Sequence, residues 1–320
     1  MSPVVRIGVA AVAFLLVAVA GTADAARKPK ELLQYIPADT PYVMAFTKPL
    51  PEELLDKMEP AVEETLGAYR RMIEFMVADI RAEAAAENGA EDGIEPMSEE
   101  ELRRFEAVMD EFMGMLSVQG LRDAGIGRDS LFAIYGDGLL PVVRLALTDG
   151  EKFDAAIARI EKKAEESLEV AELDGVSYRY VDFDEQARLI IATPKDDAVI
   201  ALVPSAYDDQ RLAVTLGIKK PRNSLAKSKT LDKIADKYGF TEHSLGFFDV
   251  QRIAASFLGD PTGLNAELLA LMEYDASQLD DTCRAEFGEL AAIAPRVVVG
   301  YTASDYGVAW DDSVQTRYGS

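Results

Sequence analysis

A tight β-hairpin in the middle of the chain constrains the fold more than any other feature. Val170–Leu173 and Val176–Tyr180 are short runs of strand-forming residues joined by Asp174 and Gly175. An Asp-Gly pair favours the type I′ turn, which joins two antiparallel strands directly. We therefore expect the strands around this turn to pair in antiparallel fashion, with a helix packed on them.

Short strands and helices are interleaved along most of the chain. Their order has no regular strand-helix-strand rhythm, which predicts an α+β fold with a mainly antiparallel sheet and packed helices, rather than a doubly wound parallel sheet. The expected strands are Tyr42–Phe46, Leu131–Tyr135, Val142–Leu147, Leu189–Ala192, Val199–Val203, Ser244–Asp249, Arg296–Tyr301 and Tyr306–Trp310. The expected helices are Asp149–Glu166, Asp208–Leu216, Thr230–Tyr238, Gln251–Leu258, Leu264–Met272 and Asp281–Ile293.

Two long amphipathic segments lie before most of these strands. In the first, about 52–86, apolar residues recur every three or four positions, and Pro60 predicts a kink or a restart. The second, about 98–116, begins with a capping box made by Ser98 and Glu101. An acidic loop joins the two. We therefore expect a long helical hairpin whose first arm, about 45 Å at 1.5 Å per residue, projects from the body.

The N-terminus has the features of an export signal. Arg6 precedes an uncharged run over 7–20, which is too short for a comfortable membrane span but typical of a signal peptide. The small-residue pattern Ala23-Asp24-Ala25 follows, so we expect cleavage after Ala25. The basic residues at 27, 28 and 30 argue for an uncleaved anchor with a cytoplasmic body. The length, the small residues and the cleavage pattern favour a periplasmic or secreted protein.

We expect three parts: the signal peptide at 1–25, a strand with the helical hairpin at 26–128, and an α+β sheet domain at 129–320. The composition, 49% apolar and 28% charged, is that of globular proteins. No later stretch is long and apolar enough to predict a membrane span. One possible duplication is visible: Thr40–Met58 and Glu242–Leu258 each place an aromatic-bearing strand before an amphipathic helix. This single match does not enter the predicted fold.

The net charge of −23 is unchanged by removal of residues 1–25, which takes away one arginine and one aspartate. So acidic a chain repels nucleic acid and anionic lipid headgroups, whose binding depends on lysine and arginine. The interpretation we favour is that this charge keeps the protein soluble. Attraction of cations or of a basic partner is the second interpretation.

Cys283 is the only cysteine, which excludes an intramolecular disulfide and leaves a buried thiol or a bond between chains.

The sequence lacks the common catalytic and cofactor motifs, including G-x-S-x-G, H-E-x-x-H, C-x-x-C, the Walker phosphate loop and the dinucleotide fingerprint. The single histidine, His243, is interpreted as an ordinary loop residue. Asp182, Asp184 and Glu185 begin like a calcium loop, but Ala187 stands where that loop needs glycine. We therefore assign no catalytic, metal-binding or cofactor-binding residue. A hydrolase that uses acidic residues for catalysis is the alternative to a protein without catalytic residues.

Methionine is concentrated in or beside the predicted helical hairpin. Met72 and Met76, like Met109 and Met113, stand one helical turn apart, so their thioethers could bind a soft ion such as Cu(I). A flexible methionine stripe would also suit a groove for an apolar helix or a lipid. The plain interpretation, which we favour, is that these methionines fill the core between two helices.

The segment Tyr35-Ile36-Pro37-Ala38-Asp39-Thr40-Pro41-Tyr42-Val43, behind a signal peptide, resembles the start of bacterial exported proteins that contain a domain of unknown function. Gly138–Pro141 before a strand and Gly246–Asp249 before a helix are similar in kind. The resemblance covers most of the mature chain. It implies an envelope protein without assigned catalytic residues. It also implies relatives that extend beyond the Trp310 strand, in which case the last sheet would be incomplete and Cys283 could have lost a partner.

These observations favour an exported, non-enzymatic binding protein that contacts a protein partner through the helical hairpin. The alternatives are a hydrolase that uses acidic residues and a copper-binding protein that uses the hairpin methionines.

Overall fold

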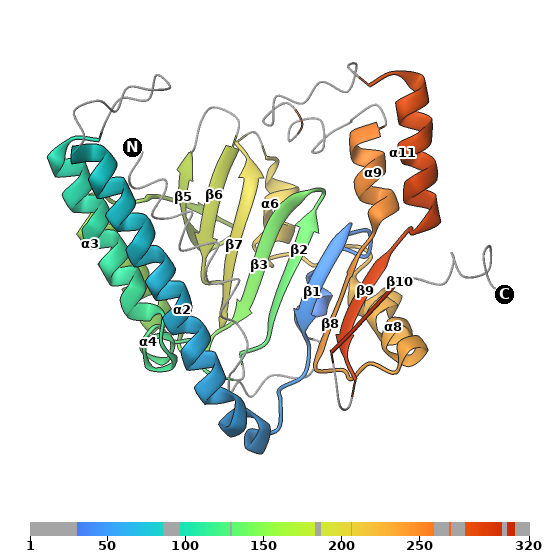
Figure 1. The fold of residues 1–320 in the computed structure, drawn as a ribbon, viewed down its shortest axis with the longest axis horizontal. Coiled ribbons are helices and arrows are strands. Elements are labelled where there is room, and N and C mark those ends of the chain that lie inside the picture. Colours follow the sequence, from blue (N-terminus) through green and yellow to red (C-terminus); the bar gives the residue numbers. More distant parts are fainter. Residues whose placement is uncertain are drawn as a thin grey trace.

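The computed structural model describes residues 31–85, 97–128, 130–182, 187–205, 207–258, 269, 279–302 and 306–310. In this part of the chain, ten strands form one antiparallel sheet in the order β10-β9-β8-β1-β2-β3-β7-β6-β5-β4 (Figure 1). The strands are β1 Tyr42–Phe46, β2 Phe132–Asp137, β3 Leu140–Ala146, β4 Glu169–Leu173, β5 Val176–Asp182, β6 Ala187–Ala192, β7 Asp197–Pro204, β8 Ser244–Phe248, β9 Val297–Tyr301 and β10 Tyr306–Trp310.

Apart from η1, which precedes β1, the described helices lie between these strands in the chain. They are η1 Leu32–Gln34, α2 Glu52–Ala85, α3 Glu99–Met115, α4 Val118–Asp123, α5 Gly150–Ala164, α6 Asp209–Thr215, α7 Leu225–Ser228, α8 Thr230–Tyr238, α9 Val250–Leu258 and α11 Asp281–Ile293.

The α+β class with a mainly antiparallel sheet is confirmed. The expected Asp-Gly hairpin joins β4 to β5, with Leu173 opposite Val176. Asp174 and Gly175 both have positive φ, 49° and 81°. This backbone conformation matches the twist of the two strands, which explains why the sequence has glycine at the second turn position.

Two cores sandwich the sheet because alternate residues of each strand point to opposite faces. In β2, for example, Phe132 points into one core, whereas Ala133 and Tyr135 point into the other. The first core, which we call the α2-side core, lies under α2, α3, α4 and α5. The second, the α8-side core, lies under α6, α7, α8 and the residues around η1. Most of the molecule is therefore a sheet covered on both faces.

Helix α3 belongs to the body of the protein, and α2 lies on its outer side. Phe105, Val108, Met109 and Phe112 of α3 are at most 1% exposed and pack in the α2-side core. The expected capping box is present, because Ser98 and Glu101 exchange hydrogen bonds at the start of α3. The expected restart at Pro60 is wrong, since α2 continues through this residue as one helix.

Ion pairs and hydrogen bonds attach α2 to its neighbours along most of its length. Near its C-terminal end, Arg81 pairs with Glu106 of α3 at 2.5 Å. In its middle, Arg70 donates to the Leu116 carbonyl at 3.1 Å, and Glu63 accepts from the Val118 amide at 2.8 Å. At its N-terminal end, Arg128 pairs with Asp56 and Glu59. Figure 1 accordingly shows α2 and α3 lying side by side.

The segment from Tyr35 to Val43 holds three separate elements together. The Ile36 side chain is fully buried, and its carbonyl accepts from the Leu225 amide at 2.9 Å. The Thr40 hydroxyl donates to the Gly136 carbonyl at 2.8 Å. The Pro41 carbonyl accepts from the Asp249 amide at 2.7 Å. This segment therefore fastens α7, the end of β2 and the start of α9 to the centre of the sheet.

The possible duplication seen in the sequence corresponds to a repeated order of elements. The first unit is β1, then the helices α2, α3 and α4, then the hairpin β2–β3. The second unit is β8, then helices that include α9 and α11, then the hairpin β9–β10. The leading strands β1 and β8 are antiparallel neighbours, with Tyr42 opposite Phe248. The centre of the sheet is therefore the junction of two units of the same topology.

Several expectations fall outside the described residues, among them the signal peptide at 1–25, the acidic loop of 91–96 and the helix Leu264–Met272 apart from Leu269. Of that helix, Leu269 is described and is buried.

Candidate functional site

The methionines singled out in the sequence do not share one environment. Met109 is 1% exposed in the α2-side core, and Met113 packs at the edge of that core. Met72 and Met76 lie on the outer surface of α2 and are 58% and 43% exposed. One pair therefore fills space between helices, as the plain interpretation expects, whereas the other faces solvent.

His243 lies just before β8 and is half-buried. Its Nδ1 atom is 3.2 Å from the carbonyl oxygen of Lys48. The adjacent Glu242 carbonyl accepts from the Thr47 hydroxyl at 2.5 Å. Both contacts join the end of β1 to the start of β8. This geometry agrees with the interpretation of His243 as an ordinary loop residue.

Of the predicted acidic loop, the structure describes only Asp182, because Asp184 and Glu185 lie outside the described residues. The Asp182 carboxylate forms two hydrogen bonds with the Arg188 guanidinium, at 2.7 and 3.0 Å. No cluster of three or more histidine, cysteine, aspartate or glutamate side chains able to hold a metal ion occurs among the described residues.

Cys283 is half-buried in the first turn of α11. Its amide donates to the Asp280 carboxylate at 2.8 Å. The negative charge of Asp280 raises the pKa of the Cys283 thiol. A thiol whose pKa is raised is mostly protonated at neutral pH and is a weak nucleophile. This environment does not favour a catalytic role.

A partly buried acid lies at the end of β2. The carboxylate of Asp137 accepts a hydrogen bond from the Tyr207 hydroxyl. Burial raises the pKa of Asp137, and burial is also the main cause that raises the pKa of Tyr207. A carboxyl with a raised pKa is typical of general acids. Of the charged groups around it, Asp39 reinforces the rise and Arg211 opposes it.

An exposed apolar patch lies on the outer surface of α2. Phe75 is 75% exposed, and Met72 and Met76 flank it at helical spacing. Large apolar side chains scattered singly on a surface are common, but adjacent ones are characteristic of contact surfaces. We call Met72, Phe75 and Met76 the α2 patch.

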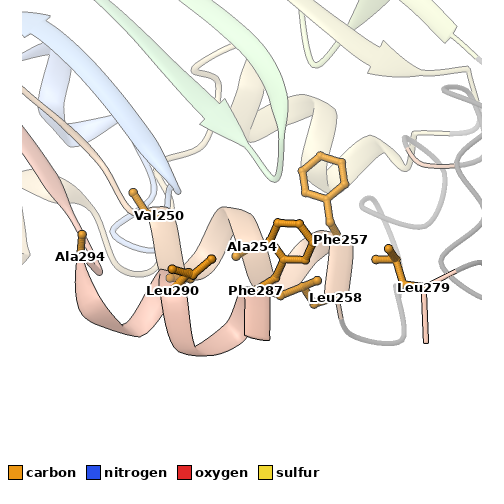
Figure 2. A pocket seen from close by; sticks show the side chains of 9 residues that line it. Val250, Ala254, Phe257, Leu258, Leu279, Phe287, Leu290 and Ala294 are labelled. Carbon is orange, nitrogen blue, oxygen red and sulfur yellow. The ribbon is translucent and has the colours of Figure 1, made fainter. Parts of the chain in front are cut away.

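An apolar groove of about 550 Å³ lies between α9 and α11 (Figure 2). The described residues that line it are all apolar. They are Val250, Ala254, Phe257, Leu258, Leu279, Phe287, Leu290, Ala291 and Ala294. In Figure 2, Val250 and Ala294 lie at one end, and Phe257 and Leu279 lie at the other.

Polar contacts of two arginines fix the ends of this groove. At one end, the Arg284 guanidinium donates to the carbonyls of Leu258 and Leu279, at 2.8 and 3.1 Å. The first contact satisfies a carbonyl at the C-terminus of α9, where helical partners are missing. At the other end, Asp249 is only 6% exposed and pairs with Arg296 at 2.7 Å. Both ends of α9 are therefore attached to the segment that carries α11.

Side chains in the groove remain unusually accessible for their type. None of the residues of α9 is buried, and in α11 only Ala291 is. Phe287 and Leu290 are 54% and 61% exposed. Neither side chain was singled out from the sequence, since the apolar periodicity of α9 and α11 is the same as that of a helix packed on a core. The exposure of these two side chains becomes visible only in three dimensions.

Among the described residues, no helix is both long enough and apolar enough to cross a membrane. Comparison of the chain with models of protein families, with curated proteins and with solved structures gives no match.

Proposed function

We propose that this chain is an exported, non-catalytic binding protein of the bacterial envelope, and that α2 and α3 act as a helical hairpin that contacts a protein partner. The observation that carries this proposal is the α2 patch, in which Phe75 is 75% exposed between two methionines. An exposed aromatic side chain is a common anchor at protein interfaces. Methionine side chains adapt to irregular partners.

The support behind the patch also fits a binding role. On the opposite side of α2, Leu66 and Ile73 are 1% exposed and pack in the α2-side core. The contact between Arg81 and Glu106 fixes the helix one to two turns beyond the patch. A partner would therefore bind a surface that is already ordered, which lowers the entropic cost of association.

Catalysis and copper binding have weaker support. Met72 and Met76 face solvent, whereas Met109 is in the core, so the four methionines do not favour one copper site. Asp137 has the raised pKa of a general acid, but the acidic residue that reinforces this rise, Asp39, is an exposed side chain. These observations favour binding over either chemistry.

Cross-linking in cells tests the proposal. A photoreactive amino acid at Glu74, beside the α2 patch, is expected to capture a partner, and M72S/F75S/M76S is expected to abolish the captured species. Leu54, 40% exposed on the same helix, provides the matched control L54S, which should leave capture unchanged. Capture that persists in the triple variant would show that the patch is not the contact surface.

Export is tested separately on the same cells. The proposal expects the protein in the periplasmic or secreted fraction, with Ala26 as its first residue. Recovery of an intact N-terminus in the membrane fraction would instead indicate an uncleaved anchor.

A further inference from the structure

The exposed face of α2 extends from the α2 patch toward the N-terminus of the helix. Phe75 lies in line with Ala68 and Ala61, because residues seven positions apart lie on the same side of a helix. All three side chains are exposed. They lie opposite Leu66 and Ile73, which are buried in the α2-side core. We call Ala61, Ala68 and Phe75 the α2 row.

The α2 row is self-complementary in size about Ala68. Phe75 lies seven residues after Ala68, and the small Ala61 lies seven residues before it. When two copies of α2 lie antiparallel with their Ala68 residues opposite each other, the Phe75 ring of each copy meets Ala61 of the other. A large side chain then faces a small one on both sides of Ala68, as close packing requires. A contact between two identical surfaces must have this symmetry.

The charges beside the α2 row have the same symmetry. Glu64 lies four residues before Ala68, and Arg71 lies three residues after it, on the same side of the row. In the antiparallel pair, Glu64 of each copy therefore lies beside Arg71 of the other, which gives two ion pairs across the contact. Both side chains are exposed, and neither has an ion-pair partner among the described residues. They are therefore available to a second copy.

The same charges disfavour neighbouring registers of the antiparallel pair. A shift of one heptad in one direction brings Arg71 beside Arg71 of the other copy. A shift in the other direction brings Glu64 beside Glu64, and Lys57 beside Arg71. Like charges that face each other disfavour association. The register about Ala68 therefore satisfies both the sizes and the charges of this face.

We infer that α2 pairs in antiparallel orientation with α2 of a second copy of this chain, about a twofold axis at Ala68. This dimer rests on the proposed function, in which α2 contacts a protein partner, and it identifies that partner. The α2 row forms the centre of the contact, with Glu64 and Arg71 on one side. On the other side, Met72 lies beside Thr65 of the second copy.

Leu54 lies outside this contact, although it continues the spacing of the row. It is fourteen residues from Ala68, which is about 21 Å along the helix at 1.5 Å per residue. Two helices that cross at about 20° have diverged at that distance from the axis. The contact therefore covers the middle of α2, and L54S remains a control for it.

Sedimentation equilibrium of the mature chain tests this dimer. About 0.15 M salt in the buffer largely screens the repulsion between two chains of net charge −23. We expect the wild type to form dimers. F75D places a charge in the centre of the contact, and E64R places a second cation opposite Arg71. Each substitution should weaken dimerisation about tenfold or more.

Exchange of the two charges provides the matched control. E64R/R71E places opposite charges beside each other again and should restore the dimer. E64R and R71E should each be mainly monomeric alone but should form a heterodimer when mixed, because one chain then carries two cations and the other two anions. Glu289 is exposed on α11, so E289R makes the same change of charge away from α2 and should leave the dimer unchanged. Circular dichroism checks that the variants keep the wild-type helix content.

Three results would overturn the dimer. The first is a wild type that is monomeric at every concentration. Cross-linking at Glu74 then separates the two proposals, because capture of a different protein would leave the proposed function standing, whereas no capture would overturn both. The second is a dimer that F75D and E64R leave unchanged, which would place the contact on another surface. The third is a mixture of E64R and R71E that stays monomeric.

Discussion

Arg144 is the residue whose burial most needs an explanation. It is only 1% exposed on β3 and points into the α8-side core. Its guanidinium donates to the Thr215 carbonyl at 2.7 Å, lies 4.7 Å from the centre of the Tyr35 ring and pairs with Asp197 at 3.6 Å. Burying a charge is costly unless such partners surround it. Arg144 therefore ties the N-terminal segment and the end of α6 to the sheet.

Replacing Arg144 by methionine is expected to destabilise the protein strongly. The change removes the cation that pairs with the buried Asp197 at 3.6 Å. Breaking a buried ion pair costs about 3–5 kcal/mol. Urea denaturation of R144M should show this loss in the free energy of unfolding. Arg222 is exposed, so R222M should change the same quantity by less than about 0.5 kcal/mol. Equal effects of the two substitutions would contradict this account of Arg144.

Asp137 is expected to make stability depend on pH. Burial raises its pKa above the ordinary value of 3.8, so the folded protein holds this proton more tightly than the unfolded chain does. The contribution to stability is therefore full below the ordinary pKa and is lost as the pH rises through the raised pKa. D137N has no such proton to lose, and its amide oxygen can still accept from Tyr207.

The measurement is a pair of urea titrations for the wild type and D137N, at pH 4 and at pH 7. The free energy of unfolding of D137N relative to the wild type should rise between the two pH values, by about 1.4 kcal/mol for each unit by which the pKa is raised. A difference that is the same at both pH values would show that Asp137 titrates alike in the folded and unfolded states.

Single elements follow from local sequence wherever a chemical signal marks one of their ends. Asp174 and Gly175 identify the β4–β5 hairpin, because few residues tolerate positive φ. Ser98 and Glu101 identify the start of α3. The ends of α2 and α3 agree with the predicted helices at 52–86 and 98–116 to within one residue. Local propensity and capping suffice for these elements, since the interactions concerned lie within a few residues.

Helix α2 also shows the limit of the rule that proline interrupts a helix. Pro60 predicts a kink or a restart, and of these two the restart is wrong, because the helix continues through it. Tertiary contacts hold the helix in place around this residue, such as that of Glu59 with Arg128 at 3.0 Å. Tertiary contacts of this kind cannot be read from the periodicity of the helix.

Replacing Pro60 by alanine should stabilise α2. The new amide can donate to the Asp56 carbonyl, and proline costs about 3 kcal/mol relative to alanine in a helix interior. Amides 57–64 of P60A should therefore exchange with deuterium more slowly than those of the wild type. Ala61 is exposed on the same turn and provides a control of opposite sign. Because glycine disfavours the helix relative to alanine, A61G should make the same amides exchange faster. Faster exchange in P60A would mean that the proline conformation is needed there.

At the scale of the whole molecule, the order of the strands escapes sequence analysis. β1 and β8 are about 200 residues apart in sequence but are neighbours in the sheet, where Val43 lies opposite Phe247. Their sequences predict strands, but nothing in them specifies which strands pair. The groove between α9 and α11 escaped prediction for a related reason. Phe257 and Phe287 have the spacing of core residues, and whether a core covers them depends on the rest of the fold.

This arrangement predicts how the chain behaves when it is divided. Residues 129–320 alone lack β1, which is hydrogen-bonded to β2 on one side and to β8 on the other. They also lack α3, whose buried residues Phe105 and Phe112 complete the α2-side core. The fragment would expose that core and break the sheet at its centre, so it should not unfold cooperatively in urea, whereas the chain from Ala26 to Ser320 should.

Adding residues 26–128 as a separate chain supplies both missing parts. We expect the mixture to regain cooperative unfolding and slow hydrogen exchange in β2 and β8, the two strands that contact β1. Slow exchange in both strands of the isolated fragment would contradict this expectation and would mean that the sheet closes without β1. Because β1 alone joins the two halves of the sheet, this experiment separates a protein that folds as one cooperative unit from one built of independent domains.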